Sequence, residues 1–386
     1  MQMSVQLDVT QHQTWPGLAN LTHSMLCALG AVGFRNSFGL APARATCLLL
    51  IDGLGHDLLR EYRDEAPFLA GLMRPDGVFR VGFPATTASS LAALASGLGS
   101  GAHGIVGCSF ALDADSEFSP LTWTCAPFVA QRAFAEVPTP EQFIVPQTAW
   151  EQATEQGLRI STVMPARYAE SAYTRAIYKG SQILGAPSYY GYPQLVRQAL
   201  EVNAPALCFA YFADLDFAGH LFGPGSDAWL AQLRVADRLA ESIFQQLPAG
   251  ARLLVTADHG MLGLDADAVV DFDREPALQD GVLAVAGDIR ARHVYVDAAR
   301  LDRTQERWRD RLGDGYTVLS KADAIAGGLF GDVMLSQAEA RIGDLIVVPN
   351  GGGGIIRSEV EPAASRWLGH HGALTDADQV VPLLMA

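Results

Sequence analysis

Three strongly apolar runs constrain the fold of this chain more than any other feature of its sequence. They are CLLLI at 47–51, ALCFAYF at 206–212 and ARLLVT at 251–256. A strand without polar alternation is typical of a parallel sheet that helices cover on both faces. Amphipathic helical patterns lie between the runs, the longest at 226–247. We therefore expect an α/β protein, a three-layer α/β/α sandwich with a mostly parallel central sheet.

An aspartate follows each of the three runs within four residues. They are Asp52, Asp216 and Asp258. In a parallel sheet the carboxyl ends of the strands lie at one edge, and α/β proteins bind their ligands there. A single carboxylate at such a position commonly caps the next helix. Three of them at one edge favour a shared binding site.

Histidines accompany two of these aspartates, and a further pair lies near the C-terminus. His220 is four residues after Asp216, His259 is adjacent to Asp258, and the pair is at 370–371. The spacing of His220 alone also fits the start of a helix. Aspartate together with neutral histidine suits Zn²⁺, with Mn²⁺ or Fe²⁺ as alternatives. The pattern therefore predicts a metal site.

The segment 81–104 contains a candidate nucleophile. Thr87 precedes a stretch rich in alanine, serine and leucine, which is typical of a buried helix and ends at Gly97. Thr87 therefore falls at or just before a helix N-terminus, where free backbone N–H groups and the helix dipole favour an anion. Threonine is also a common N-cap, so a capping role is the alternative.

Composition excludes several classes of protein. The net charge of −15 argues against a nucleic-acid groove. No apolar run approaches the roughly 20 residues of a membrane span. The five cysteines are scattered and lack CxxC spacing, and the first residues lack the pattern of a secretory leader. We therefore expect a cytoplasmic protein.

The length of 386 residues predicts either one large domain with a subdomain or two domains. Residues 262–345 are richer in charge and contain short strand patterns, so we expect a small α+β insertion there. We expect a further sheet strand at 341–350, where the sequence is RIGDLIVVPN. We expect loops and short helices at 109–145. The tract 351–354 lacks the Gly-Lys-Ser/Thr ending of a phosphate-binding loop and is expected to be a turn.

Five motifs occur in a fixed order along most of the chain. They are LLLIDGLG, FPATTASSLAALASGLGSGAHGIVG, ADLDFAGHLFGP, VTADHGM and GHHG. In this order they resemble the alkaline phosphatase superfamily, and within it the nucleotide pyrophosphatase/phosphodiesterase branch. In that family the nucleophile is followed ten residues on by glycine and sixteen on by His-Gly. Counting from Thr87 gives Gly97 and His103, whereas Thr86 is out of register. The resemblance implies a single catalytic domain over 1–386.

The resemblance also implies which residues act in the site. One metal would be held by Asp52, Asp258, His259 and Thr87, and the other by Asp216, His220 and His371. Thr87 would be the nucleophile, and Ala88 and Ser90 would contact the substrate, although Ser90 stands where relatives carry asparagine. Two Zn²⁺ ions would clamp the attacking and leaving oxygens of an in-line displacement.

These features predict hydrolysis of a phosphodiester or phosphoric anhydride through a phospho-threonine intermediate. The substrate would be a small phosphate ester or a nucleotide-like molecule. The stretch between Arg80 and Arg132 contains no arginine, which favours a diester over a more highly charged monoester. Phe217, Trp123 and Tyr168 are candidates for a substrate-binding wall. The alternatives are a phosphomonoesterase, sulfatase or phosphonate hydrolase of the same superfamily, and a non-catalytic metal-binding protein.

Overall fold

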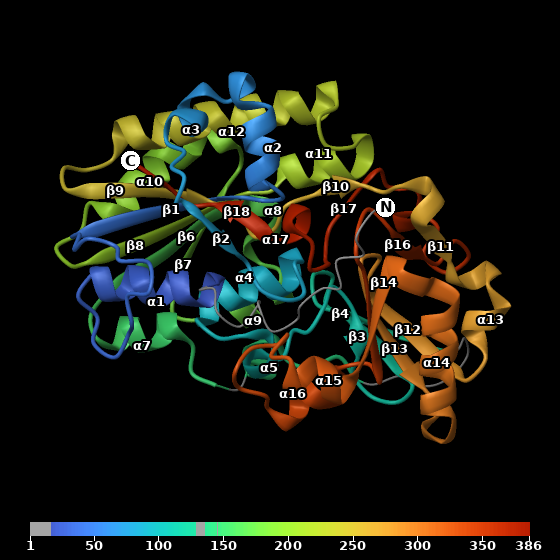
Figure 1. Ribbon diagram of the computed structural model, residues 1–386. Helices are drawn as coiled ribbons and strands as arrows, with labels where there is room; N and C mark the ends of the chain where they lie inside the picture. Colours follow the sequence, from blue (N-terminus) through green and yellow to red (C-terminus); the bar gives the residue numbers. More distant parts are fainter. Residues whose placement is uncertain (1–16, 129–135, 145) are drawn as a thin grey trace.

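A computed structural model describes residues 17–128, 136–144 and 146–386. The first residues, which lack the pattern of a secretory leader, lie outside the described residues. The chain builds a central six-stranded sheet in the order β19-β9-β1-β8-β6-β7 (Figure 1). Five strands are parallel: β1 (Ala45–Ile51), β6 (Arg159–Pro165), β7 (Gln182–Ala186), β8 (Ala206–Phe212) and β9 (Ala251–Thr256). Only the edge strand β19 (Leu384–Met385) is antiparallel. The predicted α/β class with a mostly parallel sheet is confirmed.

Helices cover both faces of this sheet (Figure 1). One layer contains α1 (Leu18–Ala28), α4 (Thr87–Ser96) and α7 (Ala149–Glu155), and the other contains α3 (Pro67–Gly71), α10 (Tyr192–Leu200) and α12 (Asp227–Gln246). Every residue of β1 and β8 is buried, because helices pack on both sides of them. The uninterrupted apolar runs therefore reflect two-sided burial.

A second, four-stranded sheet lies beside the central one (Figure 1). Its order is β12-β13-β15-β14, with β12 (Val282–Asp288), β13 (Ala291–Val296), β14 (Tyr316–Ser320) and β15 (Leu345–Pro349) all antiparallel. Helix α14 (Leu301–Leu312) packs on it through Trp308, which is fully buried in a separate apolar cluster. The strand expected at 341–350 forms as β15, and it belongs to this second sheet.

The segment 109–145 differs from our expectation of loops and short helices. It contains a three-stranded antiparallel sheet of β3 (Phe110–Ala111), β4 (Ser116–Ser119) and β5 (Thr124–Pro127), followed by α6 (Pro140–Phe143). These strands have two to four residues, which is too short for a period-2 pattern to be visible in the sequence. Trp123 packs there against Phe118 and Phe143, so it forms core instead of a substrate wall.

The remaining elements are short connections. The helices are α2 (His56–Glu61), α5 (Ser100–His103), α8 (Ala166–Ala169), α9 (Ala172–Ile177), α11 (Asp214–Phe222), α13 (Pro276–Gln279), α15 (Lys321–Ala326), α16 (Ser336–Arg341) and α17 (Asp376–Gln379). The strands are β2 (Val78–Arg80), β10 (Leu262–Gly263), β11 (Val269–Asp271), β16 (Gly354–Ile356), β17 (Gly369–His370) and β18 (Val380–Pro382). Among the helices described, none has both the length and the apolar character needed to cross a bilayer.

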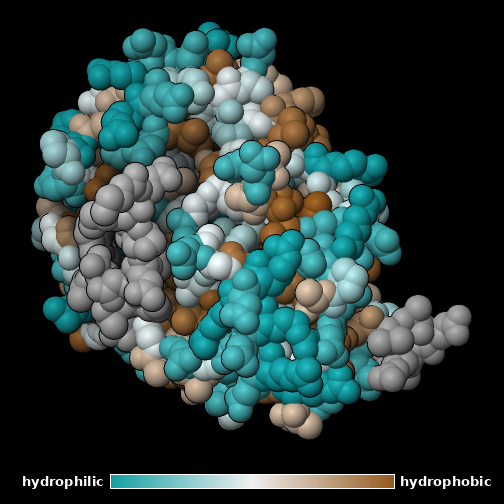
Figure 2. Space-filling view, turned by 45° about the vertical axis from the view of Figure 1, so that its right-hand side comes forward, coloured by the Kyte–Doolittle hydropathy of each residue, from teal (hydrophilic) through white to brown (hydrophobic). Residues whose placement is uncertain are grey.

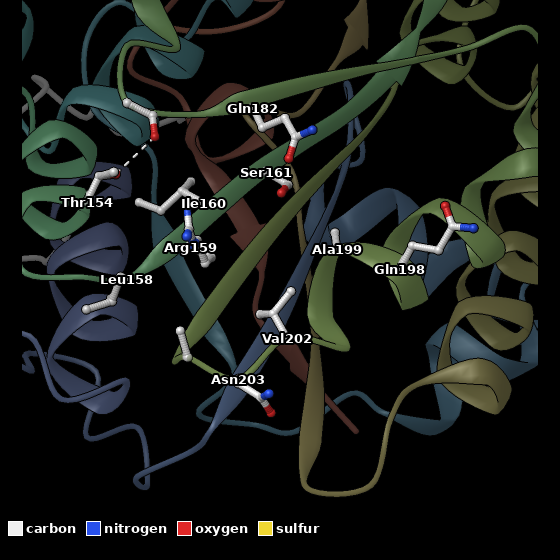
Figure 3. Close-up of a pocket in the computed structure, with 12 residues that line it drawn as sticks. Thr154, Leu158, Arg159, Ile160, Ser161, Gln182, Gln198, Ala199, Val202 and Asn203 are labelled. Carbon is white, nitrogen blue, oxygen red and sulfur yellow. Dashed lines mark hydrogen bonds between the residues drawn. The ribbon is translucent and has the colours of Figure 1, made fainter.

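A pocket of about 560 Å³ opens at the amino ends of β6 and β7 (Figure 3). Arg159, Gln182, Gln198 and Asn203 line it, and Thr154 closes one side by a hydrogen bond from its hydroxyl to the carbonyl of Gly180. The predicted aspartates follow the opposite, carboxyl ends of β1, β8 and β9, and no predicted site residue lines this pocket. The pocket is therefore separate from the candidate site.

Candidate metal centre and nucleophile

The order of the central strands brings the three strand-end aspartates together. Strands β9, β1 and β8 are neighbours, and Asp52 directly follows β1. Its N–H donates to the carbonyl of Phe212 at 2.9 Å, so the pairing with β8 extends to the site. Asp258 follows β9 by two residues, and Asp216 lies in the first turn of α11 after β8. The three carboxylates therefore meet at one edge of the sheet.

The first ligand group consists of Asp52, Asp258 and His259, whose donor atoms lie within 4.8 Å of one another. His259 Nε2 is 3.3 Å from Asp52 Oδ1 and 3.5 Å from Asp258 Oδ2. All three side chains are buried. The hydroxyl of Thr87 joins them, with Oγ1 at 3.1 Å from His259 Nε2 and 3.5 Å from Asp52 Oδ1.

The second ligand group consists of Asp216, His220 and His371. Asp216 and His220 are one turn apart on α11, and His220 Nε2 lies 3.3 Å from Asp216 Oδ2. His371 Nε2 lies 3.8 Å from Asp216 Oδ1. The ring of His371 stacks on the ring of His259 with 3.6 Å between centroids, so the two ligand groups are adjacent.

Backbone carbonyls orient all three histidine rings. His259 Nδ1 lies 2.9 Å from the carbonyl of Gly260. His220 Nδ1 lies 2.7 Å from the carbonyl of Gly369, and His371 Nδ1 lies 2.8 Å from that of Ala85. A carbonyl oxygen only accepts, so each Nδ1 carries the proton and each Nε2 presents a lone pair. This arrangement is typical of histidines that bind metal through Nε2.

The electrostatics of the two groups also fit cations. Burial raises the pKa of Asp52 well above its usual value, and the neighbouring Asp258 and Asp216 carboxylates raise it further. Burial likewise raises the pKa of Asp258. Among the described residues, Asp258 Oδ2 and Asp216 Oδ1 are buried without a hydrogen-bond partner. A divalent cation compensates both the repulsion and the unpaired oxygens, and the mixture of carboxylate and imidazole suits Zn²⁺.

The helix start at Thr87 rules out the capping alternative. Helix α4 begins at Thr87, and the N-cap position before it is Thr86, whose side chain makes no capping hydrogen bond. The backbone N–H of Ala88 has no acceptor among the described residues. Tyr173 fixes this turn, because its hydroxyl donates to the Ala88 carbonyl at 2.6 Å. The turn therefore presents a hydroxyl and a free N–H at a helix N-terminus, which favours an anion.

Ser90, a predicted substrate contact, and His370, the neighbour of the predicted ligand His371, lie apart from the ligand groups. Ser90 lines a groove of about 430 Å³ with His23, Arg80 and Gln379, and none of the predicted metal ligands lines that groove. His370 turns its Nε2 toward the carbonyl of Trp367, 3.0 Å away, and belongs to neither ligand group.

Sequence reasoning missed Asp288 and Arg290, which flank the tip of the β12–β13 hairpin. Asp288 Oδ1 accepts from the Thr86 hydroxyl at 3.0 Å, and Oδ2 accepts from the N–H of Cys108 at 3.3 Å. The buried guanidinium of Arg290 donates to both oxygens of Asp378, at 2.9 and 2.7 Å. No sequence signal connects these residues to the site, because their partners come from distant segments.

Tyr211 was also missed, and its hydroxyl donates to Asp52 Oδ2.

The hairpin tip braces two parts of the centre. Asp288 holds the residue that precedes Thr87. Asp378 also accepts from the N–H of Ala373 at 3.2 Å, so Arg290 acts through Asp378 on the loop that carries His371. The second sheet therefore contacts the turn of Thr87 and the loop of His371 through one hairpin.

Comparison with known proteins establishes the class. The model of the type I phosphodiesterase / nucleotide pyrophosphatase family matches residues 46–374, which is most of the chain. The chain is therefore a metal-dependent hydrolase of the alkaline phosphatase superfamily. It belongs to the type I phosphodiesterase / nucleotide pyrophosphatase family. No curated protein sequence is significantly similar to it.

Solved structures of two kinds share the fold. Murine ectonucleotide pyrophosphatase/phosphodiesterase 5, solved as an inactive variant with AMP, is similar with a TM-score of 0.65 and 17% identity, over 88% of this chain and 87% of that one. Phosphonoacetate hydrolase from Sinorhizobium meliloti, in complex with phosphonoformate, is similar with a TM-score of 0.64 and 17% identity, over 89% and 90% of the two chains.

Replacing His371 by alanine should weaken metal binding more than replacing its neighbour His370. His371 belongs to the second ligand group, whereas His370 Nε2 already faces a carbonyl. We expect His371→Ala to lose about half of the bound metal after dialysis and His370→Ala to lose little, as measured by elemental analysis. Equal losses from the two variants would contradict this assignment.

Proposed function

We propose that the chain hydrolyses a phosphodiester or phosphoric anhydride, with Thr87 as the nucleophile and a metal ion at each ligand group. The observation that carries this proposal is the position of Thr87 Oγ1 at a helix start, 3.1 Å from His259 Nε2 and 3.5 Å from Asp52 Oδ1. Two cations held there would lower the pKa of the Thr87 hydroxyl and of a water molecule, and would offset negative charge on the leaving oxygen.

The chain's own residues supply the remaining parts of the reaction. The Thr87 hydroxyl gives its proton to water as Oγ1 attacks phosphorus, the bond to the leaving oxygen breaks, and the leaving group takes a proton back from water. The N–H of Ala88, which has no acceptor among the described residues, donates to a non-bridging oxygen. Water then attacks the phospho-threonine, which releases the phosphate product and restores the hydroxyl. Tyr173 and Asp288 hold the backbone on both sides of Thr87 during these steps.

We propose zinc as the metal, two ions per chain. Each ligand group offers three side chains of mixed carboxylate and imidazole type, and Thr87 adds a fourth donor to the first. Three protein ligands plus one exchangeable position are typical of catalytic zinc. The family is metal-dependent, which is consistent with this proposal.

The charge around the centre favours a diester. Arg167 pairs with Asp214 at 2.8 Å, and Arg290 and Arg292 pair with Asp378 and Glu361. These guanidiniums are therefore already neutralised. A monoester brings two negative charges, and enzymes that bind it commonly add a guanidinium or a further cation.

We therefore expect bis(p-nitrophenyl) phosphate to be hydrolysed with higher kcat/KM than p-nitrophenyl phosphate. Both release the same phenol, so the ratio reports the group that stays on phosphorus. Release of p-nitrophenol by zinc-loaded protein measures it, with phosphonoacetate and p-nitrophenyl sulfate assayed in parallel. A tenfold preference for the monoester, the sulfate ester or the phosphonate would overturn the diesterase proposal and leave the threonine mechanism intact.

Replacing Asp288 by leucine, which removes both acceptor oxygens, should lower kcat by about 10- to 100-fold, the usual effect of losing a buried hydrogen bond to a charged group. Because Asp288 acts through Thr86, we expect KM and zinc content to change little. Thr86→Val removes the same hydrogen bond from the other side. The double variant should therefore be no slower than the worse single variant. Additive losses, or loss of zinc in Asp288→Leu, would show that Asp288 has only a structural role.

A further inference from the structure

Four large apolar side chains are exposed beside the second ligand group. Phe217 and Leu221 on α11 are 64% and 39% exposed, and Trp367 and Leu368, just before β17, are 38% and 55% exposed. We call these four residues the apolar rim. Apolar surface is visible in the upper right part of Figure 2, at the level of α11.

The apolar rim is directly attached to the metal ligands. The ring of Trp367 lies 4.5 Å from the ring of His220, centroid to centroid. The N–H of Leu368 donates to the carbonyl of His220 at 2.7 Å. Phe217 and Leu221 each follow a ligand, Asp216 or His220, and are one turn apart on the same side of α11. A molecule bound at the second ligand group is therefore within reach of the rim.

The fold does not need these side chains where they are. Helix α11 buries Leu215, Ala218 and Gly219 against the rest of the protein. Single exposed apolar residues are common, but four of them around one candidate ligand group are typical of a recognition surface. The rim therefore has the properties of a substrate-binding surface.

We propose that the apolar rim binds the leaving group of the substrate, and that this group is an uncharged aryl or alkyl alcohol. This inference rests on the proposed function and adds one assignment to it. Because Thr87 lies in the first ligand group, the cation at the second group would be the one at the leaving oxygen. A leaving group that carries phosphate or carboxylate would meet apolar side chains here and would depend instead on Arg366, an exposed base adjacent to Trp367. The rim thus selects esters of apolar alcohols over phosphoric anhydrides.

The test uses two methyl aryl phosphodiesters whose phenols have matched ionisation constants and differ only in a butyl substituent. In the zinc-loaded protein, the butyl ester should have a kcat/KM about tenfold higher, because part of the added chain leaves water. The ratio should fall to about 1 in Phe217→Ala and in Leu221→Ala. The control is Leu283→Ala in β12, which removes a 63% exposed leucine from the second sheet. This leucine is not part of the apolar rim, so the variant should keep the wild-type ratio.

Several outcomes would overturn the proposal. One is a kcat/KM ratio of the two esters near 1 in the wild-type protein. Another is a wild-type ratio in both Phe217→Ala and Leu221→Ala. A preference for nucleoside triphosphates that is lost in Arg366→Gln would assign the surface to an anionic leaving group. Sedimentation that shows a dimer dissociating in Phe217→Ala, with the ratio unchanged, would assign the rim to a second copy of the chain.

Binding of the free alcohol separates this proposal from the proposed function. 4-Butylphenol should quench tryptophan fluorescence of the zinc-loaded Thr87→Ala variant, and Trp367→Phe in that background should remove the quenching. Quenching without turnover of any diester by the wild-type protein would support the rim and contradict the function. Turnover without any quenching would support the function and contradict the rim.

Discussion

Replacing Thr87 by alanine is expected to abolish turnover, with a loss in kcat of at least about 10³-fold, the scale seen when a nucleophile is removed. The reason is chemical, because no other hydroxyl is in contact with both His259 and Asp52 among the described residues. The variant should retain its fold, since the substitution removes only one methyl group and one hydroxyl from a helix start. It should also retain most of its metal, because Asp52, Asp258 and His259 remain. Steady-state kinetics with elemental analysis checks both expectations.

Two matched variants act as controls for Thr87→Ala. Thr87→Ser keeps the hydroxyl and should retain measurable turnover. Thr86→Val keeps the shape of the preceding residue and loses only its hydrogen bond to Asp288, so it should lose far less than Thr87→Ala. If Thr86→Val were the inactive variant, the nucleophile would be Thr86.

Zinc-loaded protein is expected to contain close to two equivalents of zinc, and Asp258→Ala is expected to lose nearly all activity. Asp258 is fully buried between His259 and Asp52, and its Oδ2 has no hydrogen-bond partner among the described residues. Removing it takes a ligand from the first group and alters the charge around Thr87. Plasma emission analysis measures the metal, and circular dichroism confirms that the variant is folded.

The control for this prediction is Asp376→Ala. Its carboxylate is exposed and pairs with Arg80, well outside both ligand groups, so metal content and activity should be unchanged. One equivalent of zinc in the wild-type protein would contradict the two-metal proposal. Full activity of Asp258→Ala would remove this carboxylate from the mechanism.

The central sheet and the ligand groups were predictable because their signals are local. Strands buried on both faces read as unbroken apolar runs, and the aspartates follow these runs directly. The rule that parallel strands end at one edge then places Asp52 and Asp258 together, although they are 206 residues apart in the sequence. The histidines followed from their proximity to these aspartates and, for His371, from the family motif.

The supporting residues were not predictable, because their roles depend on how separate segments dock. Asp288 lies 202 positions after Thr86, in a different sheet, and a lone aspartate at a hairpin has no pattern of its own. Strand β15 has an ordinary apolar sequence, and only its pairing with β13 and β14 assigns it to the second sheet. Apolar patterns predict which segments become strands, and they do not predict which partner each strand selects.

The β12–β13 hairpin divides the second sheet into two regions with different tolerance to change. Positions 288 and 290 are fixed by buried partners on both sides of the centre. Helix α14 lies on the outer part of this sheet, and its exposed face contacts none of the ligand groups. A new recognition module should therefore be inserted within the outer helix, with the hairpin tip left unchanged. Asp288 and Arg290 hold the segments that carry Thr87 and His371, so a change at the tip would move both.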